Sequence, residues 1–237
     1  MDSLEKFAGQ KLSQLETKGL RRWLSQTDRT SGTVAIRNGK TLISFCCNDY
    51  LNLSHHPEVK RAAIEATGKY GAGAGASRLV TGNHSLYGEL ESALARLKGA
   101  GDTCVFGSGY LANLGVIPAL VGPGDLILID ALSHACLMAG GKLSGAETLM
   151  FRHNDLFHVT QLLNTQRKNY RHCLILTDGV FSMDGDLAPV CELAILANEF
   201  NAWLMTDDAH GIGVLANGRG SSFVSDVKAG VPLQMGT

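Results

Sequence analysis

Hydrophobic positions along most of the chain follow two alternating patterns. From residue 85 onward, stretches with apolar residues at helical spacing alternate with short, continuous apolar runs. Strand-length runs separated by helices are typical of βαβ units, which build a mainly parallel sheet. The helical stretches are 85–98, 109–120, 134–144, 155–168 and 189–200, and the apolar runs are 103–106, 125–130, 147–151, 172–178 and 202–207. The expected fold class is α/β, with helices on both faces of the sheet.

The first part of the chain has a different pattern. Residues 2–24 place leucine, phenylalanine and tryptophan at helical spacing, which predicts a surface helix ending near Arg21 and Arg22. These arginines fit a solvated face, and an anion-binding role stays open. Asn38-Gly39 then separates two short strand-like segments. It predicts a β-hairpin, because both central positions of its turn need positive φ.

A second helix is expected from Pro57 to about Tyr70, since proline suits the first turn of a helix. The following segment, 71–78, consists mainly of glycine and alanine. It is typical of a loop, although it could cradle an anion or allow two subunits to approach closely. We therefore expect an amino-terminal arm over residues 1–47 and one large domain over residues 48–237.

Composition excludes several classes of function. Lysine and arginine number 21 and the acids 22, so a net charge of -1 does not favour a nucleic-acid or anionic-membrane partner. The amino terminus has no continuous apolar segment, which favours a cytoplasmic protein. The spacing of cysteines and histidines favours reduced thiols and no metal site.

Polar residues follow four of the predicted strands. Because the carboxyl ends of parallel strands lie at one edge of a sheet, these residues should gather there. The first group opens a helix, whose backbone N–H groups favour a phosphate. The four groups are Gly107-Ser108-Gly109-Tyr110, Asp130 to His134, Asp178 to Asp186, and Asp207-Asp208-Ala209-His210-Gly211.

Each group also has a purely structural interpretation: a turn, a helix cap, a loop hydrogen bond or a solvated strand end. Together, however, they supply a phosphate cradle, a flat ring in His134, a carboxylate in Asp207 and a second histidine, His210. This set fits pyridoxal 5'-phosphate (PLP), because an anion beside the pyridine nitrogen keeps that nitrogen protonated. A Rossmann nucleotide site is disfavoured, since Ala112 stands where the third glycine of its motif belongs.

The motifs as a set resemble the α-oxoamine synthases. This family of fold-type-I PLP enzymes joins an amino acid to an acyl-CoA with loss of carbon dioxide. The resemblance runs from about residue 45 to the end of the sequence. It rests on Asn48 to Leu51, Ser54 to Pro57, Ser77 to Gly82, Ser108 to Asn113, Leu132 to Ala135, Asp178 to Gly185 and Asp207 to Gly211.

The resemblance implies a role for each matching position. His134 stacks on the pyridine ring, Asp207 contacts the ring nitrogen, and His210 and Ser182 lie near the phenolic oxygen. The phosphate and the remainder of the cofactor are contacted by Ser108, Gly109, Tyr110 and Thr237. Asn48 and Ser77 lie near the substrate or the partner subunit of a homodimer, and Arg21 lies near the acyl chain.

Within the family, Ser108 to Asn113 and His153-Asn154-Asp155 favour members that use L-alanine and a pimeloyl thioester, either pimeloyl-CoA or pimeloyl-ACP. Glycine-using relatives, such as 2-amino-3-ketobutyrate CoA ligase and 5-aminolevulinate synthase, share most of the other motifs. Both kinds of amino-acid substrate therefore stay open.

The family places a Schiff-base lysine a few residues beyond a strand that ends in threonine. The sequence stops at Thr237, and the nearest lysine, Lys228, does not match that motif. The expectation is a PLP-binding large domain without its carboxy-terminal small domain, with little activity alone. Two alternatives are a non-catalytic PLP-binding or dimerisation module and another fold-type-I enzyme, such as an aminotransferase. The latter leaves Asp178 to Gly185 and Asn48 to Leu51 unexplained.

Overall fold

The computed structural model describes residues 3–225 and 230–237, so Lys228 lies outside the described residues. The chain forms two compact units, Met1–Ala66 and Thr67–Thr237. Residues contact one another mainly within each of these two units. The functional division expected at residue 48 stays a prediction.

The first unit holds the predicted hairpin and one further strand. Asn38 and Gly39 have φ values of 51° and 72°, so both turn positions adopt the left-handed region. The added strand, β1, pairs antiparallel with β2. The pattern of apolar residues did not predict β1, because its sequence is entirely polar. The elements are α1 (Ser3–Thr17), β1 (Thr27–Ser31), β2 (Val34–Arg37), β3 (Lys40–Ile43), η1 (Leu53–His55) and the start of α2 (Pro57–Tyr70).

Helix α1 is shorter than predicted: it ends at Thr17 and not near Arg21. Gly19 has a φ of 65°, and its N–H donates to the carbonyl of Glu16 at 2.9 Å. The N–H of Leu20 donates to the carbonyl of Leu15 at 2.8 Å. These two bonds form a Schellman motif, which ends a helix at a glycine even where the apolar spacing continues.

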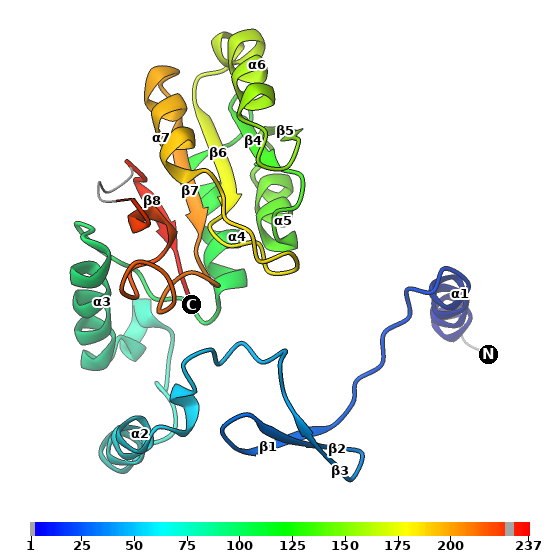
Figure 1. Ribbon diagram of the computed structural model, residues 1–237, viewed down its shortest axis with the longest axis vertical. Coiled ribbons are helices and arrows are strands. Elements are labelled where there is room, and N and C mark those ends of the chain that lie inside the picture. Colours follow the sequence, from blue (N-terminus) through cyan, green and yellow to red (C-terminus); the bar gives the residue numbers. More distant parts are fainter. Residues whose placement is uncertain (1–2, 226–229) are drawn as a thin grey trace. The chain divides into compact units, whose positions relative to one another are not determined.

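The second unit is the predicted α/β domain (Figure 1). Its helices and strands alternate along the chain, and the observed bounds of the helices lie close to the predicted ones. The elements are η2 (Arg78–Gly82), α3 (Ser85–Lys98), α4 (Gly109–Leu120), β4 (Leu126–Asp130), α5 (Ala135–Ser144), β5 (Glu147–Phe151), α6 (Leu156–Gln166), η3 (Arg167–Asn169), β6 (Cys173–Asp178), α7 (Val190–Glu199), β7 (Trp203–Asp207), η4 (Ser221–Phe223) and β8 (Leu233–Met235).

The five strands form one parallel sheet in the order β5-β4-β6-β7-β8. Successive residues of a strand face opposite sides, so each strand contributes to two cores. Leu126 and Leu128 pack with α6 and α7, whereas Ile127 and Ile129 pack with α4 and α5. Figure 1 shows these two helix layers on either side of the sheet. The predicted fold class is confirmed.

One predicted strand is wrong. Residues 103–106 form no strand, because side chains and not a neighbouring strand occupy the backbone groups of Val105. Its N–H donates to Glu91 Oε1 at 2.8 Å, and its carbonyl accepts from Arg78 Nη1 at 3.2 Å. The edge beside β7 is taken by β8, which is three residues long. The apolar pattern did not predict β8, although the resemblance implied a strand ending in threonine at this point of the chain.

Three features of the described residues bear on the class of protein. No helix among them combines the length and the apolar character needed to cross a membrane. The six cysteines are free thiols. Within residues 3–225 and 230–237, no cluster of three or more His, Cys, Asp or Glu side chains is placed to hold a metal ion.

Candidate active site

Four buried aspartates mark the carboxyl edge of the sheet. Asp130, Asp178 and Asp207 are the last residues of β4, β6 and β7, and Asp208 follows directly. Asp178 and Asp207 are register partners on adjacent strands. Because burying a carboxylate is costly unless its charge is compensated, the partners of each acid indicate what it does.

Asp208 forms a buried ion pair. Its Oδ2 lies 3.0 Å from Nζ of Lys98, the last residue of α3, and the backbone N–H of Ser221 donates to the same carboxylate. Lys98 also donates to the carbonyl of Arg219 at 2.7 Å. Asp208 has no exposed surface, and a lysine balances its charge. This arrangement is a structural anchor between α3 and the end of β7.

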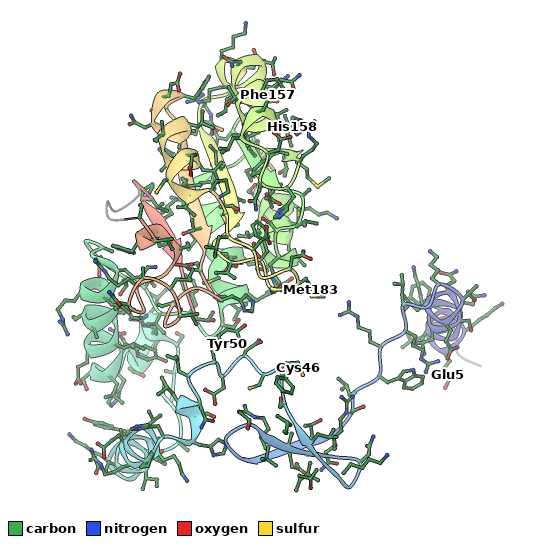
Figure 2. The ribbon with its side chains drawn as sticks, in the orientation of Figure 1. Glu5, Cys46, Tyr50, Phe157, His158 and Met183 are labelled. Atoms are coloured by element: carbon green, nitrogen blue, oxygen red, sulfur yellow. The ribbon has the colours of Figure 1, made fainter. Side chains whose placement is uncertain are left out.

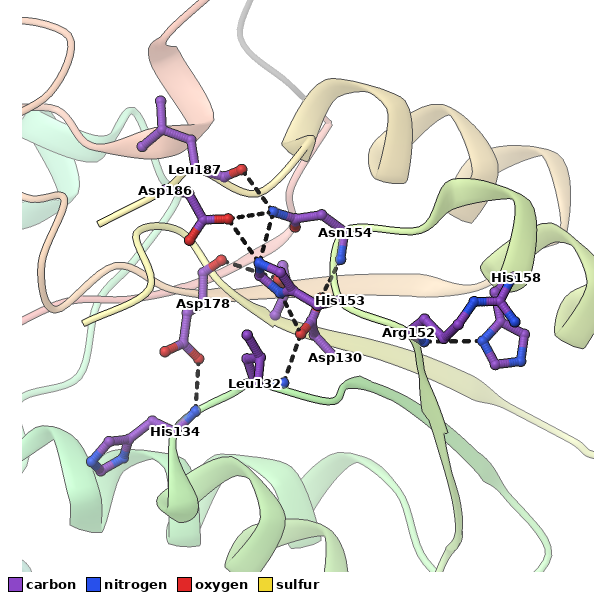
Figure 3. Close-up of polar contacts among 11 residues, drawn as sticks. Asp130, Leu132, His134, Arg152, His153, Asn154, His158, Asp178, Asp186 and Leu187 are labelled. Atoms are coloured by element: carbon purple, nitrogen blue, oxygen red, sulfur yellow. Dashed lines mark hydrogen bonds and ion pairs between the residues drawn. The ribbon is translucent and has the colours of Figure 1, made fainter. Parts of the chain in front are cut away.

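Asp130 is bonded to a histidine (Figure 3). His153 Nδ1 lies 2.9 Å from Asp130 Oδ1, and His153 Nε2 lies 2.7 Å from Asp186 Oδ2. Burial alone would lower the pKa of His153, but the bonds to Asp130 and Asp186 outweigh it and raise that pKa. Asn154 donates to both acids. The cluster fastens the loop after β6 to the end of β4.

Asp178 has a different kind of partner. Its Oδ1 accepts the backbone N–H of His134 at 3.1 Å, which Figure 3 also shows. Burial raises the pKa of Asp178 to about 7, and the nearby carboxylates of Asp207 and Asp130 add to the effect, against the His134 hydrogen bond. A substantial fraction of Asp178 is therefore protonated at neutral pH.

The side chain of Asp207 accepts hydrogen bonds from uncharged donors. Asn113 Nδ2 donates to its Oδ2 at 2.7 Å, and the N–H of Ala209 donates to its Oδ1 at 3.1 Å. No lysine or arginine in the described part of the chain forms an ion pair with it. Asp207 therefore differs from Asp208 in holding a buried carboxylate without a cation beside it.

His134 is connected to this carboxylate through Cys136. It is the N-cap of α5, and its Nδ1 accepts the N–H of Cys136 at 3.3 Å. The Sγ of Cys136 lies 2.8 Å from the same Nδ1 and 3.7 Å from Asp207 Oδ2. The structure thus brings two of the predicted cofactor residues together through one buried thiol.

The predicted phosphate-binding residues lie at the amino terminus of α4 and beside it. Ser108 is the N-cap, and its Oγ accepts the N–H of Leu111 at 3.2 Å. A Cβ on Gly109 would lie 2.5 Å from Thr237 Cγ2, so these two predicted residues are adjacent. Ser108, Tyr110 and Thr237 are exposed, and helix N–H groups beside hydroxyls favour an anion.

Ser182 and His210 occupy loops at this edge of the sheet. Ser182 is exposed in the loop after β6, which the antiparallel bridge between Val180 and Leu187 closes. Met183 is 90% exposed, and Figure 2 shows it projecting from the same loop. His210 is half-buried three residues after Asp207. The contact of either side chain with a cofactor stays a prediction.

The three predicted substrate residues lie elsewhere along the chain. Arg21 pairs with Glu16 at 2.7 Å and stacks over the Trp23 ring. Asn48 is exposed, and both residues belong to the first unit. Ser77 is exposed, and its carbonyl accepts two backbone N–H groups at the start of η2. Their roles stay predictions.

Sequence reasoning missed the residues that surround the acids. Asn113 belongs to the motif Ser108 to Asn113, but nothing in the pattern assigns its amide to Asp207. Nothing in the sequence distinguishes Cys136 from the other reduced thiols. Lys98 stands 110 residues before Asp208 and looks like a normal solvated helix end in the sequence. Only the fold brings these pairs together.

The chain belongs to the aminotransferase class I and II family, which matches residues 40–237. An 8-amino-7-oxononanoate synthase of Beijerinckia indica is 58% identical over 237 residues, 100% of this chain and 61% of that protein. A protein of Parvibaculum lavamentivorans, provisionally given the same name, is 64% identical over 238 residues, again 100% of this chain and 61% of the relative.

The structural comparison agrees with the motifs. A serine palmitoyltransferase from S. paucimobilis, solved with bound PLP and myriocin, matches with a TM-score of 0.90 and 32% identity. The match covers 100% of this chain and 61% of that enzyme, which is an α-oxoamine synthase. The predicted resemblance to the α-oxoamine synthases is confirmed. The chain spans about 61% of the length of the curated relatives it matches.

Proposed function

We propose that this chain is the PLP-binding part of an 8-amino-7-oxononanoate synthase. The whole protein would condense L-alanine with pimeloyl-CoA or pimeloyl-ACP, with loss of carbon dioxide, in biotin biosynthesis. The names of the relatives support this reaction, and the solved PLP complex of a related enzyme supports the cofactor. A homodimer is part of the proposal, as are the roles of Arg21, Asn48 and Ser77 in binding substrate.

The observation that carries the proposal is the buried side chain of Asp207, which has no cation beside it in the described residues. Asp208 is neutralised by Lys98, and Asp130 is bonded to His153. Asp207 has only uncharged donors in the described residues, and Cys136 connects it to His134 at the sheet edge. A protonated pyridine nitrogen is a flat cation that would both compensate this carboxylate and fit beside the imidazole.

The remaining residues fit the other parts of PLP. Backbone N–H groups at the start of α4, with the hydroxyls of Ser108, Tyr110 and Thr237, would hold the phosphate. Ser182 and His210 would hydrogen-bond the phenolic oxygen. The donors are thus those that the phosphate, the ring nitrogen and the phenolic oxygen each require.

When bound, PLP would withdraw electrons from the α-carbon of an amino acid, which allows that carbon to lose carbon dioxide or a proton while its electron pair is stabilised. The part of this chain is to keep a proton on the ring nitrogen through Asp207 and to hold the ring plane against His134. Because Asp207 is the buried last residue of β7, a strand paired on both sides, and its two oxygens accept hydrogen bonds from Asn113 and Ala209, its carboxylate is fixed before any ligand binds.

Equilibrium dialysis of PLP against the protein tests the proposal. We expect wild type to bind PLP and Asp207→Asn to bind it about ten- to a hundred-fold more weakly, since a charged hydrogen bond is lost. Asp184→Asn, which removes an exposed acid from the loop after β6, is the matched control and should bind like wild type. An unmeasurable affinity of wild type for PLP, or equal affinities for all three proteins, would reject the proposal.

Turnover of the whole protein tests the substrates. L-alanine with a pimeloyl thioester should be consumed in preference to glycine with the same thioester. A preference for glycine would instead assign the protein to the glycine-using relatives.

A further inference from the structure

Asn113 lies between two elements of the candidate site. It is on α4, five residues after Ser108, and its side chain has no exposed surface. Its Nδ2 lies 2.7 Å from Asp207 Oδ2 and 3.0 Å from Cys136 Sγ. The amide therefore connects the helix that begins at the phosphate cradle with the carboxylate at the end of β7.

The carboxylate fixes which way the amide points. A carboxylate oxygen accepts hydrogen bonds and cannot donate them, so the nitrogen of Asn113 must face Asp207. Its two hydrogens are then shared between Asp207 and the Cys136 sulfur. The opposite atom, Oδ1, is buried and has no hydrogen-bond partner among the described residues. An amide that leaves its carbonyl unpaired in this way is held by its two N–H contacts.

Close packing of two helices puts Asn113 in this position. Helices α4 and α5 touch at Gly140, where a Cβ would lie 3.0 Å from the Asn113 carbonyl oxygen and 2.7 Å from Ile117 Cδ1. Because glycine has no side chain, α5 approaches α4 closely enough for Cys136 to reach the Asn113 amide. Burial raises the pKa of the Cys136 thiol, so its sulfur stays protonated and receives the amide N–H as a neutral acceptor.

We propose that Asn113 is a positioning residue, which holds the Asp207 carboxylate in the orientation that recognises the protonated ring nitrogen of PLP. The inference rests on the proposed function and deepens it. Ala209 fixes Oδ1 of the carboxylate and Asn113 fixes Oδ2, so the two together define the plane of the carboxylate. The plane of the carboxylate determines which lone pairs face a ligand.

An analogue of PLP separates this role from a general role in folding. In the deaza analogue, a C–H group replaces the ring nitrogen, so the carboxylate has no N–H donor to bind. We expect wild type to bind PLP about ten-fold or more tightly than the deaza analogue, because only PLP makes the charged hydrogen bond. Asn113→Ala should reduce this preference about ten-fold. It should do so mainly by weakening PLP binding.

Ile117→Val is the matched control. Ile117 lies one turn along the same helix, has no exposed surface and contacts α5 at the same glycine, but it is apolar. The control should retain the wild-type preference for PLP over the analogue even if it lowers stability. A general loosening of α4 would change both affinities in parallel for both variants.

The possible outcomes separate the two proposals. If wild type binds no PLP, the proposed function fails. If wild type prefers PLP over the analogue and Asn113→Ala keeps the same preference, the positioning role is overturned while the proposed function stands. Should Asn113→Ala not fold, the side-chain amide NMR signal of Asn113 in ¹⁵N-labelled wild type replaces it. A shift with PLP that is absent with the deaza analogue supports the role, and equal shifts reject it.

Discussion

Asp207 and Asp208 are neighbours in the sequence and both are buried, yet their surroundings differ in charge. Asp208 faces Lys98 and the backbone N–H of Ser221, whereas Asp207 faces the uncharged Asn113 and the N–H of Ala209. Successive side chains at a strand end point to opposite sides, so one acid enters a closed ion-pair cluster and the other enters the candidate site. Of these two neighbouring acids, Asp207 is thus the better candidate to contact a ligand.

The space around the two acids differs as well. Three glycines line Asp208, and at each of them the nearest atom to an added Cβ would be an oxygen of the Asp208 carboxylate. They are Gly179, Gly211 and Gly220. The chain is therefore closed around Asp208, which leaves no room for a ligand. Asp207 is bordered by the Cys136 sulfur, 3.7 Å from its Oδ2, and that sulfur lies 2.8 Å from His134 Nδ1.

The same substitution at the two positions tests the comparison most directly. Asp208→Asn should lower the free energy of unfolding by about 3–5 kcal/mol, because it leaves Lys98 charged and buried without its partner. Asp207→Asn should stay within about 1 kcal/mol of wild type, since it exchanges one hydrogen bond for relief of a buried charge. Urea unfolding curves of the three proteins measure both values.

Lys142→Met is the control for this experiment, because Lys142 is an exposed lysine on α5. It should unfold like wild type. Equal losses of stability for Asp207→Asn and Asp208→Asn would show that both acids stabilise the fold equally. The proposed difference between the two acids would then be wrong.

The glycine lining gives a second, smaller test. Gly220 has a φ of 95°, and a Cβ there would overlap Asp208 Oδ2. Gly185 has a φ of 76°, but nothing lies within 4 Å of its Cβ position. Gly220→Ala should therefore be less stable than Gly185→Ala by about 1–3 kcal/mol, the usual effect of overpacking.

Both glycines have a positive φ, but Gly220 also has a ψ of −175°, a conformation nearly restricted to glycine. The difference between the thermal or urea unfolding curves of the two variants therefore reports that backbone strain together with the contact with Asp208. A difference near zero would mean that the ion-pair cluster can shift to admit a methyl group. The conclusion that the chain leaves no room for a ligand around Asp208 would then be wrong.

The sequence predicted the frame of the domain because local signals agree with the tertiary structure. The pattern gave α4, for example, as 109–120, its observed bounds, since Ser108 caps its start and its apolar residues pack on the sheet. The run 103–106 has strand-like composition but no strand, because Arg78 and Glu91 take the backbone groups of Val105. Side chains from distant segments therefore prevent residues 103–106 from pairing as a strand.

The candidate site was likewise predictable only in part. The sequence placed Asp207 and His134 at one edge, because strand ends of a parallel sheet converge. It did not distinguish Asp207 from Asp208, since the difference depends on Lys98 and Asn113, which are 110 and 94 residues away from those acids. Charge compensation between distant segments follows only from the folded chain.

The third acid, Asp130, lies between these two cases and gives the smallest predicted effect. His153 joins it to Asp186, and the raised pKa of His153 means that its charged form is favoured in the folded state. The stability that His153 contributes is fully present below the unfolded pKa, about 6.5, and is lost as the pH rises through the folded pKa.

Because His153 is 26% exposed and solvent screens its charge, we expect it to contribute about 1 kcal/mol or less to the free energy of unfolding. The stability difference between wild type and His153→Gln should be largest below about pH 6.5, the unfolded pKa, and should shrink as the pH rises through the raised folded pKa. His158→Gln is the control, since its Nδ1 accepts a backbone N–H and has no acid partner in the described hydrogen bonds. A pH-independent difference for His153→Gln would show that the histidine acts as a neutral hydrogen-bond link, and Asp130 would then share the uncharged surroundings of Asp207.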